Sequence, residues 1–201
     1  MKLTWYGHSC FLLESAGGSV VFDPFAPGYV PGWKLPELTA DAVLCSHGHR
    51  DHDYAEGVKL SGRPFGGTVL KIPSFHDAQG GALRGKNTIT LVEDEGIRLV
   101  HMGDIGCALT AEQIAALGRV DVLLVPVGGH YTVDAAGAWE IAKALRPAIT
   151  VPMHYRGKGF GYKVIATVEP FLELAGNVRE IAGTSWTVDL ADTPATVVFR
   201  P

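Results

Sequence analysis

Four potential metal ligands stand within six residues of one short segment, which reads SHGHRDHD at positions 46–53. Neutral imidazole and carboxylate oxygen bind zinc and similar ions, and a catalytic ion commonly takes three protein ligands and a water. The alternation of His47 and His49 lets both rings face one ion. Asp51 and His52 can turn toward a second ion, because a loop that leaves a strand need not keep the period of the strand. This density of ligands predicts a metal site and argues against a solvated loop that is merely rich in histidine.

Further potential ligands follow other strand-like stretches later in the chain. They are His76 in PSFHDAQGG, Asp104 in HMGDIG and His154 in VPMHYRG. Ligands at the ends of several strands can converge on one edge of a sandwich of sheets. We therefore expect these three side chains to join the histidine-rich segment.

The elements that must position these ligands change character along the chain. Apolar runs bounded by turn signals predict strands in the first half, at 2–6, 10–14, 19–22, 42–45, 68–72, 87–92 and 97–102. The second half alternates helices with strands. Helices are predicted within 109–120, over 134–147 and around 164–174, and strands at 122–125 and 148–151 and near 178, 187 and 197. This α/β (α+β) pattern fits two packed sheets with helices outside, a four-layer αββα sandwich.

Two local features refine this pattern. Thr110 followed three residues later by Gln113 predicts a capping box at the start of the first helix. The stretch 24–36 holds four prolines and is expected to be a surface loop long enough to be functional.

Composition suits one domain over residues 1–201, because a chain of 201 residues that is 47% hydrophobic can bury a core of useful size. The formal charge of −4 and the pI near 6.0 give no overall basic field, so nucleic acid is not an expected partner. No apolar run approaches the roughly 18 residues of a membrane span, and no signal-peptide core is visible. Three cysteines without C-x-x-C spacing suit a reducing compartment, so a cytoplasmic location is expected.

Several segments together resemble one family. The order of SHGHRDHD, His76, HMGD and VPMHY looks like the metallo-β-lactamase superfamily. More narrowly, GHSCFLLES, VFDPF, LRGKNTI, HMGDIG and PVGGHYTVDAA resemble the small metal-dependent hydrolases related to ascorbate-6-phosphate lactonase, from Tyr6 to about Tyr155. The resemblance implies the metallo-β-lactamase fold and two divalent metal ions, with Zn²⁺ expected first and Mn²⁺ or Fe²⁺ as alternatives.

The resemblance also implies a role for each matching residue. The first metal would be held by His47, His49 and His76. The second would be held by Asp51, His52 and His154, with Asp104 bridging both ions and Asp23 of VFDPF bracing the histidine loop. Two ions roughly 4 Å apart can hold a bridging hydroxide and polarise the oxygen under attack, while Asp51 orients or deprotonates the water.

Residues outside the ligand set are expected to meet the substrate or to support the site. His130 and Tyr131 lie in the glycine-rich stretch PVGGHYTVDA, and His130 is a candidate for donating to an oxyanion or protonating the leaving group. His101, three residues before Asp104, is a candidate for contact with the substrate or with the ligands. His8 follows the first strand and could likewise approach the site, but a hydrogen-bonded structural histidine is the first expectation. Cys45 ends an apolar strand and is expected to be a buried thiol.

The expected activity is hydrolysis of a small ester, lactone or phosphodiester. The substrate would be anionic if it is received by the basic loop 155–163, which carries Arg156, Lys158 and Lys163 and could instead form a subunit contact in a homo-oligomer. Three alternatives stay open: an RNA- or DNA-processing nuclease of the same superfamily, a redox di-iron centre, and a metal-dependent binding module without catalysis. The nucleases usually add a clamp or an extra domain, and the di-iron proteins place a glutamate where His49 stands here.

Overall fold

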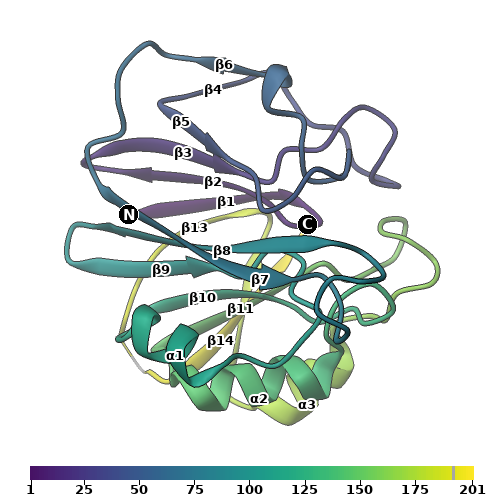
Figure 1. The fold of residues 1–201 in the computed structure, drawn as a ribbon. Helices are drawn as coiled ribbons and strands as arrows, with labels where there is room; N and C mark the ends of the chain where they lie inside the picture. The colour runs from purple at the N-terminus through teal and green to yellow at the C-terminus, as the bar shows by residue number, and fades with distance from the viewer. Residues whose placement is uncertain (192) are drawn as a thin grey trace.

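A computed structural model describes residues 1–191 and 193–201 and has two β-sheets packed face to face (Figure 1). The first sheet has five strands in the order β13-β1-β2-β3-β5. They are β1 (Lys2–Gly7), β2 (Cys10–Ser15), β3 (Gly18–Phe22), β5 (Ala42–Leu44) and β13 (Ser185–Thr187). β1, β2 and β3 form an antiparallel meander, and β5 pairs in parallel with β3. Because Phe22 and Leu44 are partners in that pairing, Asp23 and the histidine-rich segment leave the sheet side by side.

The second sheet has seven strands in the order β12-β14-β11-β10-β9-β8-β7. They are β7 (Thr68–Phe75), β8 (Lys86–Asp94), β9 (Ile97–His101), β10 (Val122–Pro126), β11 (Ile149–Met153), β12 (Val178–Ala182) and β14 (Ala195–Arg200). β7, β8 and β9 are antiparallel, whereas β9, β10, β11, β14 and β12 run parallel. The carboxyl ends of parallel strands meet at one edge of a sheet. The segments after β9 and β11, which carry Asp104 and His154, therefore leave from the same edge.

Three α-helices cover the outer face of the seven-stranded sheet (Figure 1). They are α1 (Ala111–Leu117), α2 (Ala135–Leu145) and α3 (Glu169–Ala175). The predicted capping box of α1 is confirmed, because Thr110 Oγ1 accepts from Gln113 N at 3.2 Å and Gln113 Oε1 accepts from Thr110 N at 2.9 Å. In the described part of the chain no helix has the length and apolar character that crossing a membrane requires.

The third helix begins at Glu169, and the expectation of a helix from about residue 164 is wrong. Pro170 fits only the first turn of a helix, because it has no backbone N–H to donate. The backbone just before it is used elsewhere. Ile165 O accepts from Arg156 Nε at 2.8 Å, and Ala166 N donates to Gly128 O at 2.7 Å.

The outer face of the five-stranded sheet is covered, in the described residues, by a small parallel sheet and a 3-10 turn instead of an α-helix. These elements are β4 (Leu38–Ala40), β6 (Val58–Leu60) and η1 (Ala55–Gly57) (Figure 1). Phe25 and Val30 are buried against Cys10 and Val21 in the same layer. The proline-rich stretch is therefore not only a surface loop, because the outward-facing side chains of β2 and β3 are apolar and need cover.

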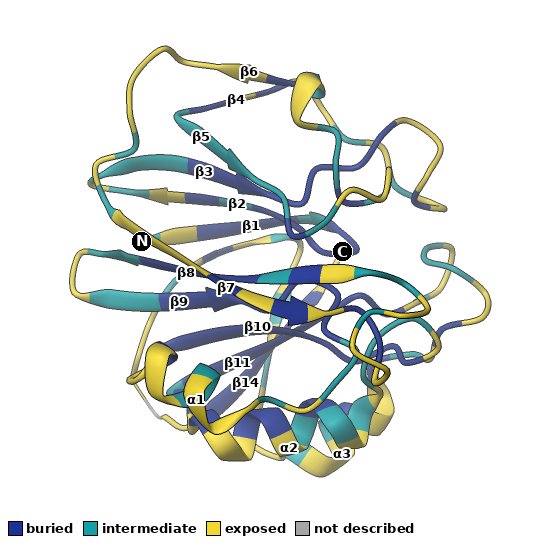
Figure 2. Ribbon diagram, in the orientation of Figure 1, coloured by how far each residue is buried: buried dark blue, intermediate teal, exposed yellow. Residues whose placement is uncertain are grey.

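The main core lies between the two sheets and between the second sheet and its helices (Figure 2). All residues of β10 and β11 are buried, as a parallel strand covered on both faces requires. The loops that follow β5, β7, β9 and β11 lie together at one end of the sandwich, on the right in Figure 1. A rigid two-sheet scaffold therefore presents the segments that carry the candidate ligands.

Candidate metal centre

The histidine-rich segment folds back on itself directly after β5. The N–H groups of His52 and Asp53 both donate to the carbonyl of His49, at 2.8 and 2.7 Å. His47 Nε2 lies 3.0 Å from His49 Nδ1, and His76 comes from the end of β7 to join them. One ligand atom of each of these three histidines lies within 4.8 Å of the others. This first group matches the three histidines that the family resemblance assigns to one ion.

Asp104 lies at the centre of the cluster. Its Oδ2 is 3.2 Å from His52 Nε2, 3.4 Å from His76 Nε2 and 3.2 Å from His154 Nε2. The turn that carries it is held from β8, because Asn87 Oδ1 accepts from Asp104 N at 2.9 Å. A single carboxylate thus meets imidazoles that come from the loops of both sheets.

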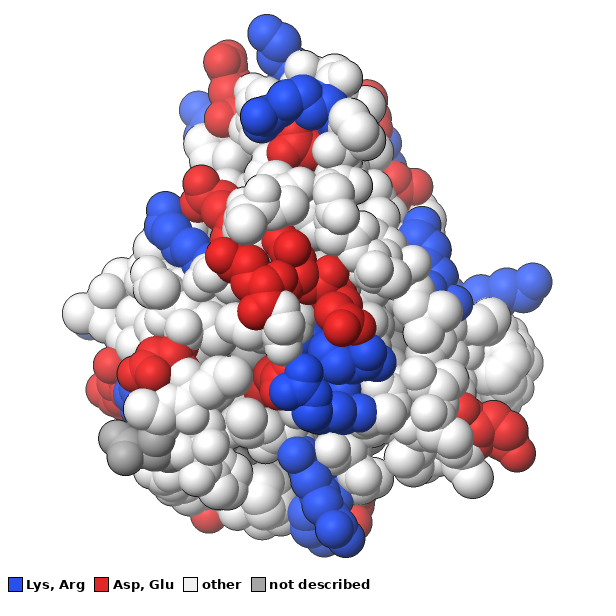
Figure 3. Space-filling view, turned by 90° about the vertical axis from the view of Figure 1, so that its left-hand side faces the viewer, with Lys and Arg blue, Asp and Glu red and all other residues white. Residues whose placement is uncertain are grey.

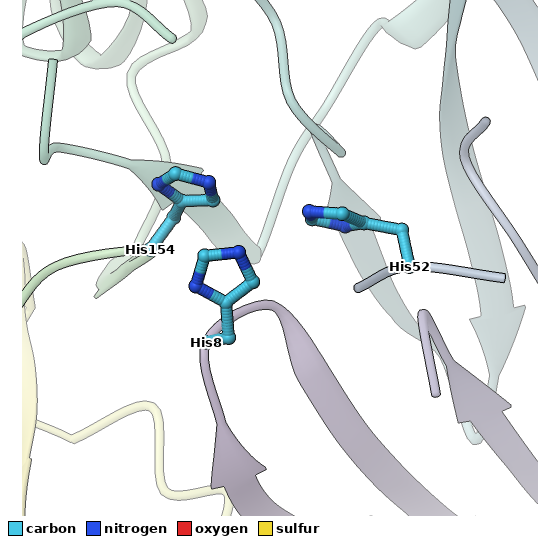
Figure 4. A group of neighbouring side chains, drawn as sticks. All are labelled: His8, His52 and His154. Carbon is cyan, nitrogen blue, oxygen red and sulfur yellow. The ribbon is translucent and has the colours of Figure 1, made fainter. Parts of the chain in front are cut away.

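His8 belongs to the cluster as well, together with His52 and His154 (Figure 4). Its ring centroid is 3.9 Å from that of His154 and 5.0 Å from that of His52, and its Nε2 lies 3.5 Å from Asp51 Oδ2. The side chain is buried, yet within residues 1–191 and 193–201 neither ring nitrogen has a hydrogen-bond partner. The expectation of a hydrogen-bonded structural histidine is therefore wrong, because Gly7 and His8 both adopt positive φ and turn the ring toward the site.

Asp23 braces the cluster from behind. Its Oδ2 accepts from His52 Nδ1 at 2.8 Å and from Ser46 Oγ at 2.6 Å, and its Oδ1 accepts from Ser46 N at 2.7 Å. Asp23 is fully buried. A carboxylate bound to one ring nitrogen fixes the imidazole and leaves the other nitrogen free for a metal.

Burial and charge set the protonation of the cluster. Burial lowers the pKa of His8 and of His47 to about 3, so both rings are neutral and can offer a lone pair. Burial alone would raise the pKa of Asp104, but His154 and His52 hold it well below its usual value. Burial alone would lower the pKa of His52, but Asp104 and Asp23 raise it above its usual value. The centre therefore combines an ionised carboxylate at Asp104 with neutral rings at His8 and His47 and a ring at His52 that holds a proton more readily.

The donor atoms of the cluster fit divalent metal ions. Several of its buried polar atoms lack a hydrogen-bond partner, and in an apolar surrounding each such atom would be costly. These atoms are Nδ1 and Nε2 of His8, Nε2 of His52, Nδ1 of His76 and of His154, and Oδ1 of Asp104. Imidazole nitrogen and carboxylate oxygen together form the ligand set that zinc and similar ions prefer. Cys45 is half-buried instead of buried and belongs to none of the three candidate groups.

A cavity of about 290 Å³ opens onto the cluster. It is lined by His49, Asp51, His76, Arg84, Asp104, Tyr131, His154 and Tyr162. Tyr162 OH donates to Tyr29 O at 2.5 Å and lies 3.2 Å from Asp51 Oδ2, and Arg84 lies over the ring of Tyr131. A larger cavity of about 790 Å³ lies between α2 and the opposite ends of β10 and β11 and contains no residue of the cluster. The volume of a cavity alone therefore does not identify the candidate metal centre.

Two histidines proposed from the sequence take other positions. His101 is buried, its Nε2 lies 2.9 Å from Ser9 O, and its Nδ1 accepts from Gly103 N at 3.1 Å. Because both ring nitrogens face backbone, His101 supports the turn before Asp104. Its predicted contact with the substrate or with the ligands stays a prediction. His130 is exposed and does not line the cavity, whereas its neighbour Tyr131 does. A catalytic role for His130 stays a prediction.

Comparisons with known proteins agree with this fold and cluster. A family model described as "Beta-lactamase superfamily domain" matches residues 2–154. A UPF0173 metal-dependent hydrolase of Thermoplasma acidophilum is 33% identical over 89% of this chain and 92% of its own. A UPF0173 metal-dependent hydrolase of Archaeoglobus fulgidus is also 33% identical, over 77% of this chain and 83% of its own. The crystal structure of a candidate Zn-dependent hydrolase of the metallo-beta-lactamase superfamily from Thermotoga maritima matches with a TM-score of 0.79 and 34% identity, over 98% of this chain and 97% of that one.

The chain belongs to the metallo-β-lactamase superfamily, and within it to the UPF0173 metal-dependent hydrolases. The predicted superfamily, its fold and the enzyme class of metal-dependent hydrolase are confirmed. The cluster at the loop end of the sandwich contains the side chains that could hold the metal ion of such a hydrolase.

Proposed function

We propose that the cluster holds two divalent metal ions, zinc foremost, and hydrolyses a small ester, lactone or phosphodiester. His47, His49 and His76 would hold one ion, and Asp51, His52 and His154 the other. The observation that supports this most directly is that Asp104 Oδ2 lies within 3.4 Å of imidazoles from three different loops. A carboxylate in that position is suited to contact both ions.

The two ions, when bound, would lower the pKa of a water between them and polarise the oxygen of the bond under attack. The side chains supply orientation and proton transfer. Asp51 would orient the attacking water and accept its proton, and it is itself faced by the hydroxyl of Tyr162 at 3.2 Å and by His8 Nε2 at 3.5 Å. Asp23 would keep His52 in the ring orientation in which Nε2 points to Asp104.

The volume of the cavity favours a small substrate. About 290 Å³ is near the lower end of the range of small-molecule sites, and Tyr131 and Tyr162 form part of its wall. The names of the relatives from Thermoplasma acidophilum and Archaeoglobus fulgidus give the class metal-dependent hydrolase and name no substrate. We therefore propose a small molecule as the substrate and not a polymer.

Metal analysis joined to a substrate screen tests the proposal. The chain is purified without chelator, its metals are measured by mass spectrometry, and turnover is assayed on lactones, thioesters, carboxylate esters and phosphodiesters. We expect close to two ions per chain and hydrolysis of at least one class. Asp104→Asn should lose most of the metal and reduce turnover by about 100-fold, whereas the matched change Asp53→Asn should retain both, because Asp53 does not line the cavity at the cluster as Asp51 and Asp104 do. Metal content well below one ion per chain would contradict the proposal.

A further inference from the structure

Arg84 is a cation in the wall of the cavity that holds the cluster. Its guanidinium lies 5.7 Å from the ring centre of Tyr131, a position that keeps the group over an aromatic face. Other arginines of the chain pair with a carboxylate, such as Arg50 with Glu56 at 2.8 Å and Arg98 with Glu93 at 2.5 Å. Among the described residues no hydrogen bond or ion pair occupies the guanidinium of Arg84, so its N–H donors are available to a ligand.

The loop that carries Arg84 is held rigidly by one buried carboxylate. Asp77 Oδ1 accepts from Gln79 N at 2.7 Å and from Gly81 N at 3.0 Å. Its Oδ2 accepts from Leu83 N at 3.0 Å and from Arg84 N at 2.8 Å. A carboxylate that accepts four backbone N–H groups leaves the loop little freedom to move.

The same loop is tied to a candidate metal ligand. His76 N donates to Gly85 O at 3.1 Å, and Gly85 N donates to Gly81 O at 2.9 Å. The backbone of Arg84 is therefore fixed in relation to His76. A cation held at a constant position beside the ligands is suited to recognise one part of a substrate while another part reacts.

The basic loop 155–163 does not supply this cation. Arg156 Nε donates to Ile165 O at 2.8 Å, and Arg156 and Lys158 line other cavities than the one at the cluster. Lys163 also does not line it. Of that loop only Tyr162 reaches the cavity, so the expected receptor for an anionic substrate lies on a different loop.

We propose that Arg84 determines specificity by binding a carboxylate or phosphate group of the substrate, and that the substrate class is a small anionic ester or lactone. This inference rests on the proposed hydrolytic function. The planar guanidinium offers paired N–H donors that match the oxygens of either anion, and its carbon lies 5.7 Å from the ring centre of Tyr131. The anion bound at Arg84 is a recognition group, distinct from the bond that reacts at the cluster.

Paired probes that share one lactone ring but differ in charge test this role. The probes are γ-butyrolactone and its 5-carboxylate, assayed with the metal-loaded wild type, Arg84→Ala, Arg84→Lys and Lys86→Ala. We expect Arg84→Ala to raise KM for the carboxylated lactone by about 10- to 100-fold more than it raises KM for the neutral lactone. Arg84→Lys should restore part of the affinity. Lys86→Ala removes the same charge from an exposed position two residues away and should change neither probe.

A binding measurement separates this inference from the hydrolytic function. Inorganic phosphate and succinate are titrated calorimetrically into wild type and Arg84→Ala, with metal content verified as equal. Weaker anion binding by Arg84→Ala than by wild type supports the inference even if neither lactone is hydrolysed. The anion that the wild type binds with higher affinity identifies the group that is recognised. The inference is overturned if wild type and Arg84→Ala bind each anion with the same affinity. It is also overturned if both proteins hydrolyse each lactone at the same measurable rate, and this result leaves the hydrolytic function standing.

Discussion

At the residue scale, Asp23 acts on the centre through its neighbours. It receives hydrogen bonds from His52 Nδ1 and from both the backbone and the hydroxyl of Ser46, and it lines no part of the cavity. Ser46 Oγ in turn lies 2.9 Å from His47 Nδ1. One buried carboxylate therefore sets the orientation of a histidine from each of the two proposed ligand sets.

Replacing Asp23 should weaken metal binding more than it weakens the fold. Asp23→Asn keeps the shape but loses the negative charge that holds His52, so we expect metal affinity to fall by about 10- to 100-fold. Competition with a chromogenic chelator measures this. Asp41→Asn is the matched control, because Asp41 likewise accepts from a backbone N–H and serine hydroxyls, at Ser19 and Ser61, far from the cluster. Unchanged metal affinity in Asp23→Asn would show that the brace has no functional part.

The side chains of the cluster differ in how far the sequence alone can predict them. The members of SHGHRDHD are neighbours in the chain, and His76, Asp104 and His154 each end a strand-like stretch, so pattern and resemblance point to them. His8, Arg84 and Tyr162 reach the site only because distant loops fold onto it. Positive φ at His8 and the carboxylate of Asp77 behind Arg84 place two of these side chains, and neither feature has a periodic signal.

At the element scale, helix α1 joins the outer layer to the sheet through its capping box. Gln113 closes the box with its Oε1 and also donates from Nε2 to Pro73 O of β7 at 2.7 Å. Thr110→Ala should cost about 1 kcal/mol of unfolding free energy, because Gln113 N loses its acceptor. Urea unfolding measures the loss, and Thr110→Ser is the control that should retain most of the stability. A loss of activity in Thr110→Ala at equal metal content would contradict a purely structural role for this cap.

The sequence predicts the ranges of strands and helices correctly where local sequence signals agree with the tertiary packing. The strands of the first half and the first two helices lie close to their predicted ranges, because alternation and caps are local properties. The short strands β4 and β6 were missed, since each has only three residues and pairs with a partner far along the chain. The predicted start of α3 is too early, because the carbonyl of Ile165 and the N–H of Ala166 form hydrogen bonds with residues outside the helix.

At the scale of the whole molecule, charge distribution favours a small-molecule enzyme over a nuclease. The net charge is −4. On the face drawn in Figure 3, the left-hand side of Figure 1 and not the end with the loops of the cluster, acidic and basic side chains lie beside one another. A protein that binds the phosphate backbone needs a positive surface whose affinity falls steeply with salt. We interpret the single cation at the cavity, Arg84, as recognition of one anionic group.

The two sheets meet at the cluster, and this arrangement links metal binding to the stability of the whole chain. His47, His49, Asp51 and His52 follow a strand of the first sheet, whereas His76, Asp104 and His154 follow strands of the second. Ions held by both sets, as proposed, would connect the sheets and would bind only the folded protein. At a free metal concentration 100 times the dissociation constant, each ion would add about 2.7 kcal/mol of stability.

We therefore expect removal of both ions by a chelator to lower Tm by about 10 to 20 °C, and added Zn²⁺ to restore it. Differential scanning calorimetry of wild type and Asp104→Asn measures the effect. The variant should show almost no dependence on metal, because the carboxylate that faces ligands of both sheets has lost its charge. A wild type that carries two ions per chain yet unfolds at the same temperature without them would mean that the ions sit on one loop and do not join the sheets.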